Sequence, residues 1–275
     1  MKSIIDEKAQ KLLGLLEGLK RVAVAFSGGV DSALLAAAAV RALGSGAVAV
    51  TAESPTLSMR ERRDAGELAA LLDIRHEILV LSELECPEFV KNDGERCYHC
   101  KKFRFEKLCA WAKEKGIPRV VEGSNVDDKS DYRPGMRAVA ELPGVSSPLL
   151  ESGFSKAEIR ELSRRWGLPT WEKPAAACLA SRISYGTPLT RENLARVERA
   201  EEIVGAFCPP NVQYRVRDHG PIARIEAERE IIPLLADPER GDELAEALGA
   251  LGFKWVTLDL EGYRMGSLND QLKDG

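Results

Sequence analysis

The sequence has 275 residues, of which 44% are hydrophobic and 30% are charged, a composition typical of a soluble globular protein with one large or two smaller domains. The formal net charge of -4 argues against a protein whose main task is to hold long nucleic acid, because that work needs a strongly basic face. The first residues are charged and no apolar run is long enough to span a bilayer, so we expect a cytoplasmic protein.

The first elements in the chain predict a phosphate-binding loop. An amphipathic helix is expected over 5–19, and an apolar strand ending at residue 26 is followed by an alanine-rich helix over 32–43. Between them, Gly28 and Gly29 let the backbone approach an anion, while Asp31 and Ser32 are placed to orient Mg²⁺ or polarise a phosphate. The Gly-Lys-Ser/Thr ending of a Walker loop is missing, and with it the lysine that contacts the β- and γ-phosphates. The alternative is a glycine-rich turn without a ligand.

The next elements predict a parallel sheet. Strands are expected over 47–52 and 78–81 with a helix over 59–72 between them, and a helix ending at Gly116 leads to a strand over 120–122. A last strand and helix over 147–166 complete the domain. Such alternation gives right-handed crossovers, with ligands at the carboxyl ends of the strands.

A polar loop over 123–135 follows one of these strand ends and is too long for a simple connector. We expect it to form a second wall of the nucleotide site, with Asp127, Asp128 or Asp131 available for Mg²⁺. The alternative is a solvated surface loop.

The last third of the chain predicts a separate small domain. A helix to residue 207, strands over 212–217 and 222–226, a helix ending at 251 and a strand over 255–260 indicate an α+β fold. We therefore expect an α/β parallel-sheet domain over 1–168, an active-site linker with Cys178 over 169–188, and an α+β domain for substrate binding or oligomerisation over 189–275.

Three cysteines form the first group of side chains suited to metal binding or redox chemistry. Cys97 and Cys100 are one helical turn apart, which suits a shared metal or a redox pair. A four-cysteine zinc site would need a second such pair, which the sequence lacks. Cys178 is the natural third thiol, because three thiolates hold an iron-sulfur cluster and leave one iron without a protein ligand. The remaining cysteines are alternative partners: Cys86, Cys109 and Cys208.

Arginines form the second group. Arg182 follows the third thiol by four residues, Arg215 and Arg217 share one face of a strand, and Arg264 follows the final strand. Guanidinium binds carboxylates and phosphate in bidentate geometry, so the set suits a substrate that carries both. The alternative is a structural role in salt bridges with these acids: Glu226, Glu228 or Asp259.

Ser27 to Ser32 resembles the pyrophosphate loop (PP-loop) of N-type ATP pyrophosphatases, and six motifs together resemble the LarE family of that class across nearly the whole chain. The motifs are Phe26-Ser27-Gly28-Gly29-Val30-Asp31-Ser32, Asn125-x-Asp127-Asp128-x-x-Asp131-Tyr132-Arg133-Pro134-Gly135, Cys178-x-x-Ser181-Arg182-x-x-Tyr185-Gly186, Arg215-x-Arg217, Ile222-Ala223-Arg224-Ile225-Glu226 and Val256-Thr257-Leu258-Asp259-Leu260-x-Gly262-Tyr263-Arg264. The resemblance implies an adenine nucleotide alpha-hydrolase-like PP-loop fold. It also implies ATP-dependent conversion of both carboxylates of pyridinium-3,5-biscarboxylic acid mononucleotide to thiocarboxylates, a step in the biosynthesis of the nickel-pincer nucleotide, the cofactor of lactate racemase.

One branch of this family sacrifices a cysteine sulfur, and the other holds a 4Fe-4S cluster on three cysteines. Cys97 and Cys100 place this chain with the second branch, with ATP, Mg²⁺ and the cluster as cofactors. In the first branch, the cysteine lies one residue further from the Ser-Arg pair than Cys178 does. The expected ATP-binding residues are Ser27, Gly28, Gly29, Asp31, Ser32 and Asp128. The expected substrate-binding residues are Lys101, Ser181, Arg182, Arg215, Arg217, Glu226 and Arg264.

Two other functions stay open from the sequence. A tRNA thiolase also joins a PP-loop to three cysteines, although its substrate demands a broad basic surface. A non-catalytic module that binds adenine nucleotides leaves the thiols and arginines unexplained. We expect a small-molecule nucleotide substrate, a homo-oligomer and neither a nucleic-acid nor a membrane partner, while the sulfur donor stays open.

Overall fold

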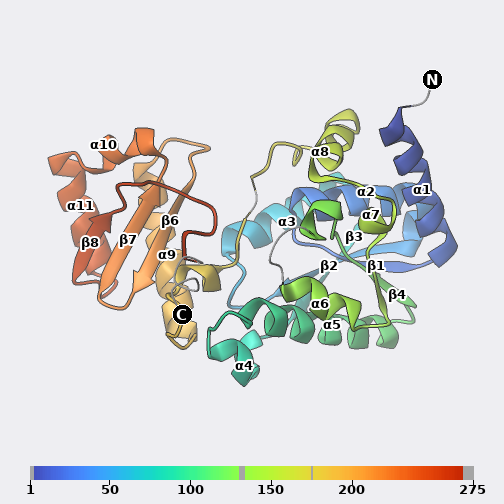
Figure 1. Cartoon of the computed structure of the whole chain (residues 1–275), viewed down its shortest axis with the longest axis horizontal. Coiled ribbons are helices and arrows are strands. Elements are labelled where there is room, and N and C mark those ends of the chain that lie inside the picture. The colour runs from blue at the N-terminus through green and yellow to red at the C-terminus, as the bar shows by residue number, and fades with distance from the viewer. Residues whose placement is uncertain (1–2, 130–133, 175, 269–275) are drawn as a thin grey trace. The chain divides into compact units, whose positions relative to one another are not determined.

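The computed structural model describes residues 3–129, 134–174 and 176–268 (Figure 1). The chain forms two compact units: the first contains Met1–Cys86 and Cys97–Ala176, and the second contains Pro87–Arg96 and Ala177–Gly275. A ten-residue segment in the first third of the sequence therefore belongs to the second unit. Among the described residues, every helix is too short or too polar to cross a membrane.

A five-stranded parallel sheet with the order β3-β2-β1-β4-β5 forms the centre of the first unit, which confirms the predicted α/β class. Its strands are β1 (Val22–Ala25), β2 (Ala47–Glu53), β3 (Arg75–Val80), β4 (Arg119–Val121) and β5 (Val145–Ser146). β3 begins three residues before the predicted strand over 78–81. Its first residues are polar because β3 lies at the edge of the sheet, where its side chains are only partly covered.

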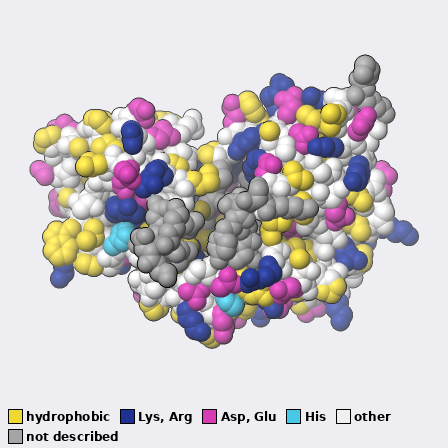
Figure 2. Space-filling view, in the orientation of Figure 1, with side chains coloured by type: hydrophobic (Ala, Val, Ile, Leu, Met, Phe, Trp, Pro, Cys, Tyr) yellow, Lys and Arg dark blue, Asp and Glu magenta, His cyan; other side chains and the backbone are white. Residues whose placement is uncertain are grey.

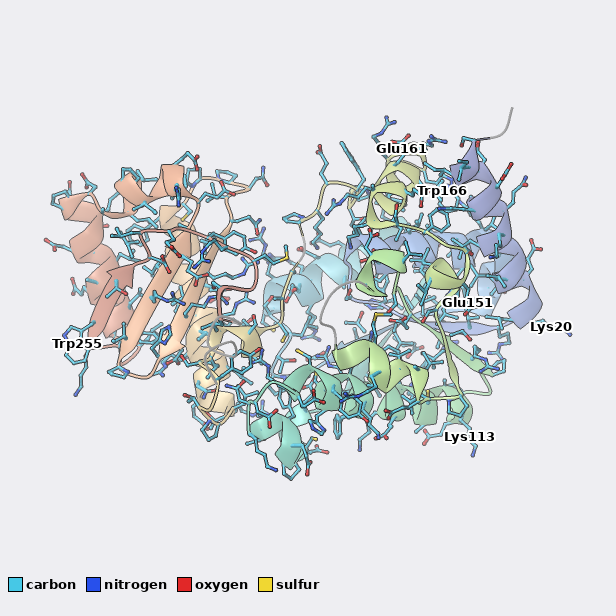
Figure 3. The ribbon with its side chains drawn as sticks, in the orientation of Figure 1. Lys20, Lys113, Glu151, Glu161, Trp166 and Trp255 are labelled. Atoms are coloured by element: carbon cyan, nitrogen blue, oxygen red, sulfur yellow. The ribbon has the colours of Figure 1, made fainter. Side chains whose placement is uncertain are left out.

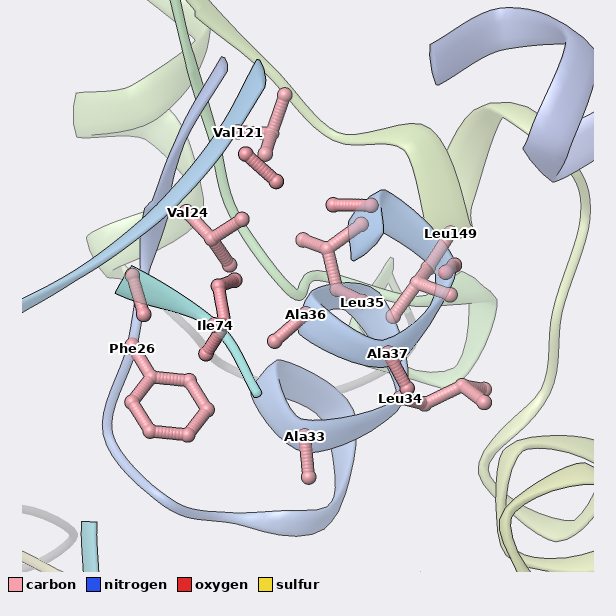
Figure 4. Packing of buried hydrophobic residues seen from close by; sticks show 14 of the residues in the cluster. Val24, Phe26, Ala33, Leu34, Leu35, Ala36, Ala37, Ile74, Val121 and Leu149 are labelled. Carbon is pink, nitrogen blue, oxygen red and sulfur yellow. The ribbon is translucent and has the colours of Figure 1, made fainter. Parts of the chain in front are cut away.

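Helices cover both faces of this sheet. They are α1 (Ile4–Leu19), α2 (Val30–Leu43), α3 (Met59–Leu71), α5 (Arg96–Glu114), α6 (Pro134–Ala140), α7 (Pro148–Glu151) and α8 (Lys156–Arg165). Leu35 of α2 packs with Val24 of β1 on one face, as Figure 4 shows. Ala23 of β1 faces Phe105 of α5 on the other. Successive side chains of β1 are thus buried on opposite faces, which explains its continuous apolar sequence.

The second unit contains a small mixed sheet, as predicted for a separate α+β domain. β6 (Tyr214–His219) runs antiparallel to β7 (Ile222–Ala227), which pairs in parallel with β8 (Trp255–Leu258). Its helices are α4 (Pro87–Val90), α9 (Arg191–Phe207), α10 (Ile232–Leu235) and α11 (Pro238–Gly249). The single helix predicted to end at residue 251 is therefore two helices, because Asp237 caps a new helix whose first residue is a proline.

The two faces of this small sheet differ. Val216 and Ile225 pack with Val204 of α9 and Leu248 of α11 in an apolar core. Alternate positions on β6 and β7 carry charges on the opposite face, where Arg215 pairs in register with Glu226. Trp255 at the start of β8 is 58% exposed and projects into solvent in Figure 3.

Candidate active site

The loop between β1 and α2 has the geometry of an anion-binding turn. Gly28 has φ +71°, and a Cβ atom there would lie 3.1 Å from the Cα of Ala65, so both the conformation and the space require glycine. Gly29 is the N-cap of α2 and offers no capping side chain, which leaves N–H groups of the first turn available to a ligand. Ser32 Oγ donates a hydrogen bond to Gly29 O at 3.1 Å and holds the turn closed.

A cavity of about 510 Å³ opens at this loop, at the carboxyl ends of β1, β2 and β4. Predicted site residues from distant parts of the first unit line it together: Ser27, Asp31, Ser32, Cys97, Lys101 and Asp128. Phe26, Val50 and Phe105 supply an apolar part of the wall. The volume suits a nucleotide-sized ligand, and the wall combines an apolar surface with a few charges, as ligand sites commonly do.

Asp31 is held by a lysine that the sequence analysis missed. Lys156 Nζ lies 2.5 Å from Asp31 Oδ2, and Asn125 Nδ2 donates to Asp31 Oδ1 at 3.4 Å. Lys156 is the first residue of α8, where its charge opposes the positive end of the helix, so the acidic partner explains its position. The chain thus brings a cation to the phosphate loop from 125 residues away, in place of a Walker lysine.

The acids predicted for Mg²⁺ differ in their contacts. Asp128 is nearly buried at the cavity wall, and its Oδ2 accepts a hydrogen bond from Asn125 N at 2.9 Å. Asp127 instead accepts from the backbone N of Lys156. Asp131 lies outside the described residues. Within the described chain, no group of three or more His, Cys, Asp or Glu side chains has the arrangement of a metal site.

Lys101 projects into the cavity from α5 and pairs with Glu122 at 3.0 Å. Burial alone would raise the pKa of Glu122, but the Lys101 charge and hydrogen bonds from Ser147 and Ser124 outweigh it and lower that pKa. Glu122 therefore stays ionised and holds the Lys101 ammonium at the site.

Arg104 is a second cavity cation that the sequence analysis missed. Its Nε contacts the carboxylate of Glu83, which is fully buried, and its Nη2 donates to Ser54 and Thr56. Cys100 Sγ lies 4.0 Å from the same carboxylate. Arg104 follows Cys97 by seven residues on the same helix, so the two side chains lie on one face, two turns apart. That spacing was the signal in the sequence that could have identified Arg104.

The six cysteines all lie within the described residues, and none forms a disulfide. Cys97 lines the nucleotide cavity in the first unit, while Cys178 immediately precedes the one-turn helix Leu179–Arg182 in the second unit. Burial raises the pKa of the thiols of Cys109 and Cys208, as expected for cysteines that act as small core residues.

Most of the predicted arginines pair with acids in the second unit. Arg217 Nη2 lies 2.6 Å from Glu226 Oε2, and Ser267 Oγ donates to the other oxygen of Glu226 at 2.7 Å. Arg182 binds Glu201 at 2.9 Å. The remaining pairs are Arg224 with Glu226 and Asp259, and Arg264 with Glu261. Arg217 thus pairs with Glu226, one of the acids named in the salt-bridge alternative, while its contact with a substrate stays a prediction.

Arg215 differs from its neighbours. Its Nη1 donates to the backbone carbonyl of Tyr214 at 2.5 Å, its guanidinium lies 5.1 Å from the ring centre of Tyr263, and it has no salt bridge within the described residues. Burial and the nearby charge of Arg182 lower its pKa. A cation that lacks a carboxylate partner in such a position is suited to receive an anion.

Comparisons with known proteins agree with this geometry. The asparagine synthase family model matches residues 15–92, which include β1, the phosphate loop and β2. An uncharacterized protein of Synechocystis sp. is 41% identical over 266 residues, covering 97% of this chain and 98% of the relative. The pyridinium-3,5-bisthiocarboxylic acid mononucleotide synthase of Lactiplantibacillus plantarum is 38% identical over 274 residues, covering 99% of this chain and 97% of that enzyme.

A tRNA-specific 2-thiouridylase of Pelobacter propionicus is 30% identical over 186 residues, but the match covers only 56% of this chain and 52% of that protein. The match to the synthase spans 99% of this chain and so extends over both units. The chain therefore belongs to the LarE family of ATP-dependent sulfurtransferases.

Proposed function

We propose that the protein inserts sulfur into pyridinium-3,5-biscarboxylic acid mononucleotide in the biosynthesis of the nickel-pincer nucleotide. ATP adenylates a substrate carboxylate with release of pyrophosphate, and sulfur then replaces AMP to give a thiocarboxylate. The observation that carries this proposal is the 510 Å³ cavity, which joins the phosphate loop to Lys101 and Cys97. The full-length similarity to the Lactiplantibacillus plantarum synthase supports the choice of substrate.

The adenylation half of the reaction rests on the first unit. The N–H groups at the start of α2 bind phosphate oxygens, and Asp31 and Asp128 would supply carboxylate oxygens to hold Mg²⁺, which would offset charge on the phosphates. Lys156 and Lys101 offset charge on the phosphates and the attacking carboxylate, since both lie beside the loop or in the cavity.

Substrate recognition rests on the second unit. Arg215 binds a carboxylate or phosphate of the substrate, because its guanidinium has no salt bridge within the described chain and already lies among other arginines. Arg217, Glu226 and Arg182 form the charged surroundings that fix its position. Ser181 and Arg264 complete the proposed substrate set.

Sulfur transfer rests on three thiols. Cys97, Cys100 and Cys178 supply the three thiolates that a 4Fe-4S cluster needs, and none of them is in a disulfide. When bound on three cysteines, such a cluster offers one iron that can carry sulfide for transfer. The donor chemistry of these residues fits the group, and the competing route is sacrifice of the Cys178 sulfur.

The two routes are tested by spectroscopy and mass measurement after anaerobic turnover with ATP and the biscarboxylate nucleotide. We expect Cys97→Ala and Cys100→Ala each to abolish visible absorption and activity, with Cys208→Ala as the matched control that keeps both. The wild-type mass should stay unchanged. Single-turnover activity in Cys97→Ala, together with loss of about one H₂S from Cys178, would establish the sacrificial route instead.

A tRNA thiolase is the second candidate, favoured by the partial match to the 2-thiouridylase. Acidic and basic side chains are mixed on the face of the molecule seen in Figure 2, whereas a protein surface that binds RNA is predominantly basic. Thiolation of tRNA without conversion of the biscarboxylate nucleotide would select this candidate. Binding of ATP without turnover of either substrate would select the non-catalytic module.

A further inference from the structure

The ten-residue segment Pro87–Arg96 interrupts the first unit in sequence but packs with the second. Its partners are the residues that follow Cys178. Asn92 Nδ2 donates to the carbonyl oxygens of Ser184 at 2.8 Å and Thr187 at 2.9 Å. Two backbone bonds flank this contact, from Gly186 N to Asn92 O and from Leu189 N to Val90 O. The Cys178 segment, residues 178–189, is therefore bound along most of its length.

Arg96 closes the same contact from the other end of the segment. Its Nη1 donates to the carbonyl oxygen of Ala180 at 3.0 Å and to the side-chain oxygen of Asn92, and its guanidinium lies 4.8 Å from the ring centre of Tyr185. Arg96 is also the residue that directly precedes Cys97 in the chain. We call Asn92 and Arg96 the clasp.

The clasp has features that packing alone does not require. Asn92 is fully buried and has φ +56°, and Arg96 is only 5% exposed with a buried Nε that has no hydrogen-bond partner within the described residues. Burying the Arg96 charge is costly, and such a cost persists where a geometry is needed for function. Asparagine is one of the few residues other than glycine that readily adopt the left-handed conformation found at position 92. Main-chain carbonyls of the Cys178 segment accept the hydrogen bonds from the clasp side chains. These bonds therefore fix the backbone and do not occupy the side chains of Cys178 or Ser181.

We propose that Asn92 and Arg96 are positioning residues for sulfur transfer: their contacts hold the Cys178 segment in one conformation. The contact between Arg96 and Ala180 joins residues 84 apart in sequence. This inference rests on the proposed function for its purpose, although its structural part is tested without any cofactor.

The test compares Arg96→Met and Asn92→Gly with wild type as reduced, metal-free protein. Glycine tolerates the left-handed backbone at position 92 and removes only the side-chain bonds. We expect hydrogen exchange at the amides of Gly186 and Leu189 to accelerate by about 5-fold or more. We also expect the ratio of the iodoacetamide alkylation rates at Cys178 and Cys208 to change by at least about 3-fold. Arg165→Met makes the same chemical change at a surface salt bridge and should change neither.

A second readout is the visible absorption after anaerobic reconstitution with ferrous iron and sulfide, which should fall by about half or more in both clasp variants. Arg96→Lys keeps one donor for Ala180 and should recover part of it. Equal acceleration of alkylation at Cys178 and Cys208 would show general loosening of the fold and overturn the proposal, as would unchanged exchange at Gly186 and Leu189. If the wild-type protein binds no iron but hydrogen exchange at Gly186 and Leu189 is still faster in the clasp variants, the cluster is refuted and the role of the clasp is supported.

Discussion

The ion pairs around the cavity of the first unit differ in exposure from the pair between Arg217 and Glu226 in the second unit. Around the nucleotide cavity, each base remains partly exposed: Lys156 at 33%, Lys101 at 28% and Arg104 at 27%. In the second unit, Arg217 and its partner Glu226 are 6% and 0% exposed. A partly exposed ammonium can turn from its carboxylate to an incoming phosphate, whereas a buried pair separates only at a large desolvation cost. We therefore expect the cavity pairs to exchange partners with a ligand and the Arg217–Glu226 pair to act in stability.

Removing the buried acid of the second unit should give the largest effect. Glu226→Gln leaves Arg217 and Arg224 facing each other without a compensating charge, and breaking a buried pair in this way costs about 3–5 kcal/mol. Urea unfolding of the second unit would measure it. Glu261→Gln is the matched control, because its pair with Arg264 is exposed and contributes about 0–1 kcal/mol. Equal losses in the two variants would show that burial of the Arg217–Glu226 pair adds nothing to its effect on stability.

Asp31→Asn should have the next largest effect, on rate rather than on stability. The substitution keeps the shape of a cavity side chain but removes the charge that we propose orients Mg²⁺ or the phosphates. We expect pyrophosphate release to slow about 100- to 1,000-fold, equivalent to about 2.7–4 kcal/mol, with an unchanged melting temperature. Asp242→Asn on α11 is the control. A variant that loses stability without losing rate would place Asp31 with the structural charges instead.

The sequence predicted the phosphate loop because that signal is local. Two glycines, an acid and a hydroxyl follow an apolar strand and open a helix, and the structure has this turn with Gly28 at φ +71°. Lys156 was not predicted because its partner Asp31 is 125 residues away and only the fold brings them together. A lysine at the first position of a helix is nevertheless an unfavourable placement that points to an acidic partner.

The clasp shows the same limit at the level of domains. Residues 87–96 have the composition of an ordinary connector, and only their hydrogen bonds to Ala180, Ser184 and Thr187 place them in the second unit. The strands of the second unit were predicted from their alternation. The different contacts of Arg215 and Arg217 were not predicted, since both arginines share one face and the acid that pairs with Arg217, Glu226, comes from another strand.

The difference between Arg215 and Arg217 gives the third prediction. Arg215→Lys keeps the charge but loses the fork that binds a carboxylate or phosphate at two points, so we expect substrate affinity to fall about 10-fold, or about 1.4 kcal/mol, with ATP affinity unchanged. Calorimetric titration of each ligand would measure this. Arg217→Lys is the comparison within the same strand and should lower the free energy of unfolding more than Arg215→Lys does. Equal loss of ATP binding in Arg215→Lys would assign this arginine to the wrong ligand.

The smallest expected effect is a pH dependence that comes from the second unit. Burial, together with the positive charge of Arg224, lowers the pKa of His219, although Asp218 and Glu226 act in the opposite direction. Ser184 contacts Nδ1 at 2.7 Å, while Nε2 is buried with no partner within the described residues, so a proton added there has no acceptor. In the unfolded chain, the imidazole of His219 instead takes up its proton at pH ~6.5.

The sign of the effect follows from that difference. His219 contributes its full stability above pH ~6.5, and the contribution is lost as the pH falls through the lower pKa of the folded state. His76 of the first unit has a pKa lowered by burial and changes stability in the same direction, so the wild-type curve alone does not assign the slope. We expect the stability of His219→Gln to fall less steeply than that of wild type on acidification, as measured by urea unfolding at a series of pH values. Parallel curves would mean that His219 does not contribute to the slope, which would then belong to other groups such as His76 of the first unit.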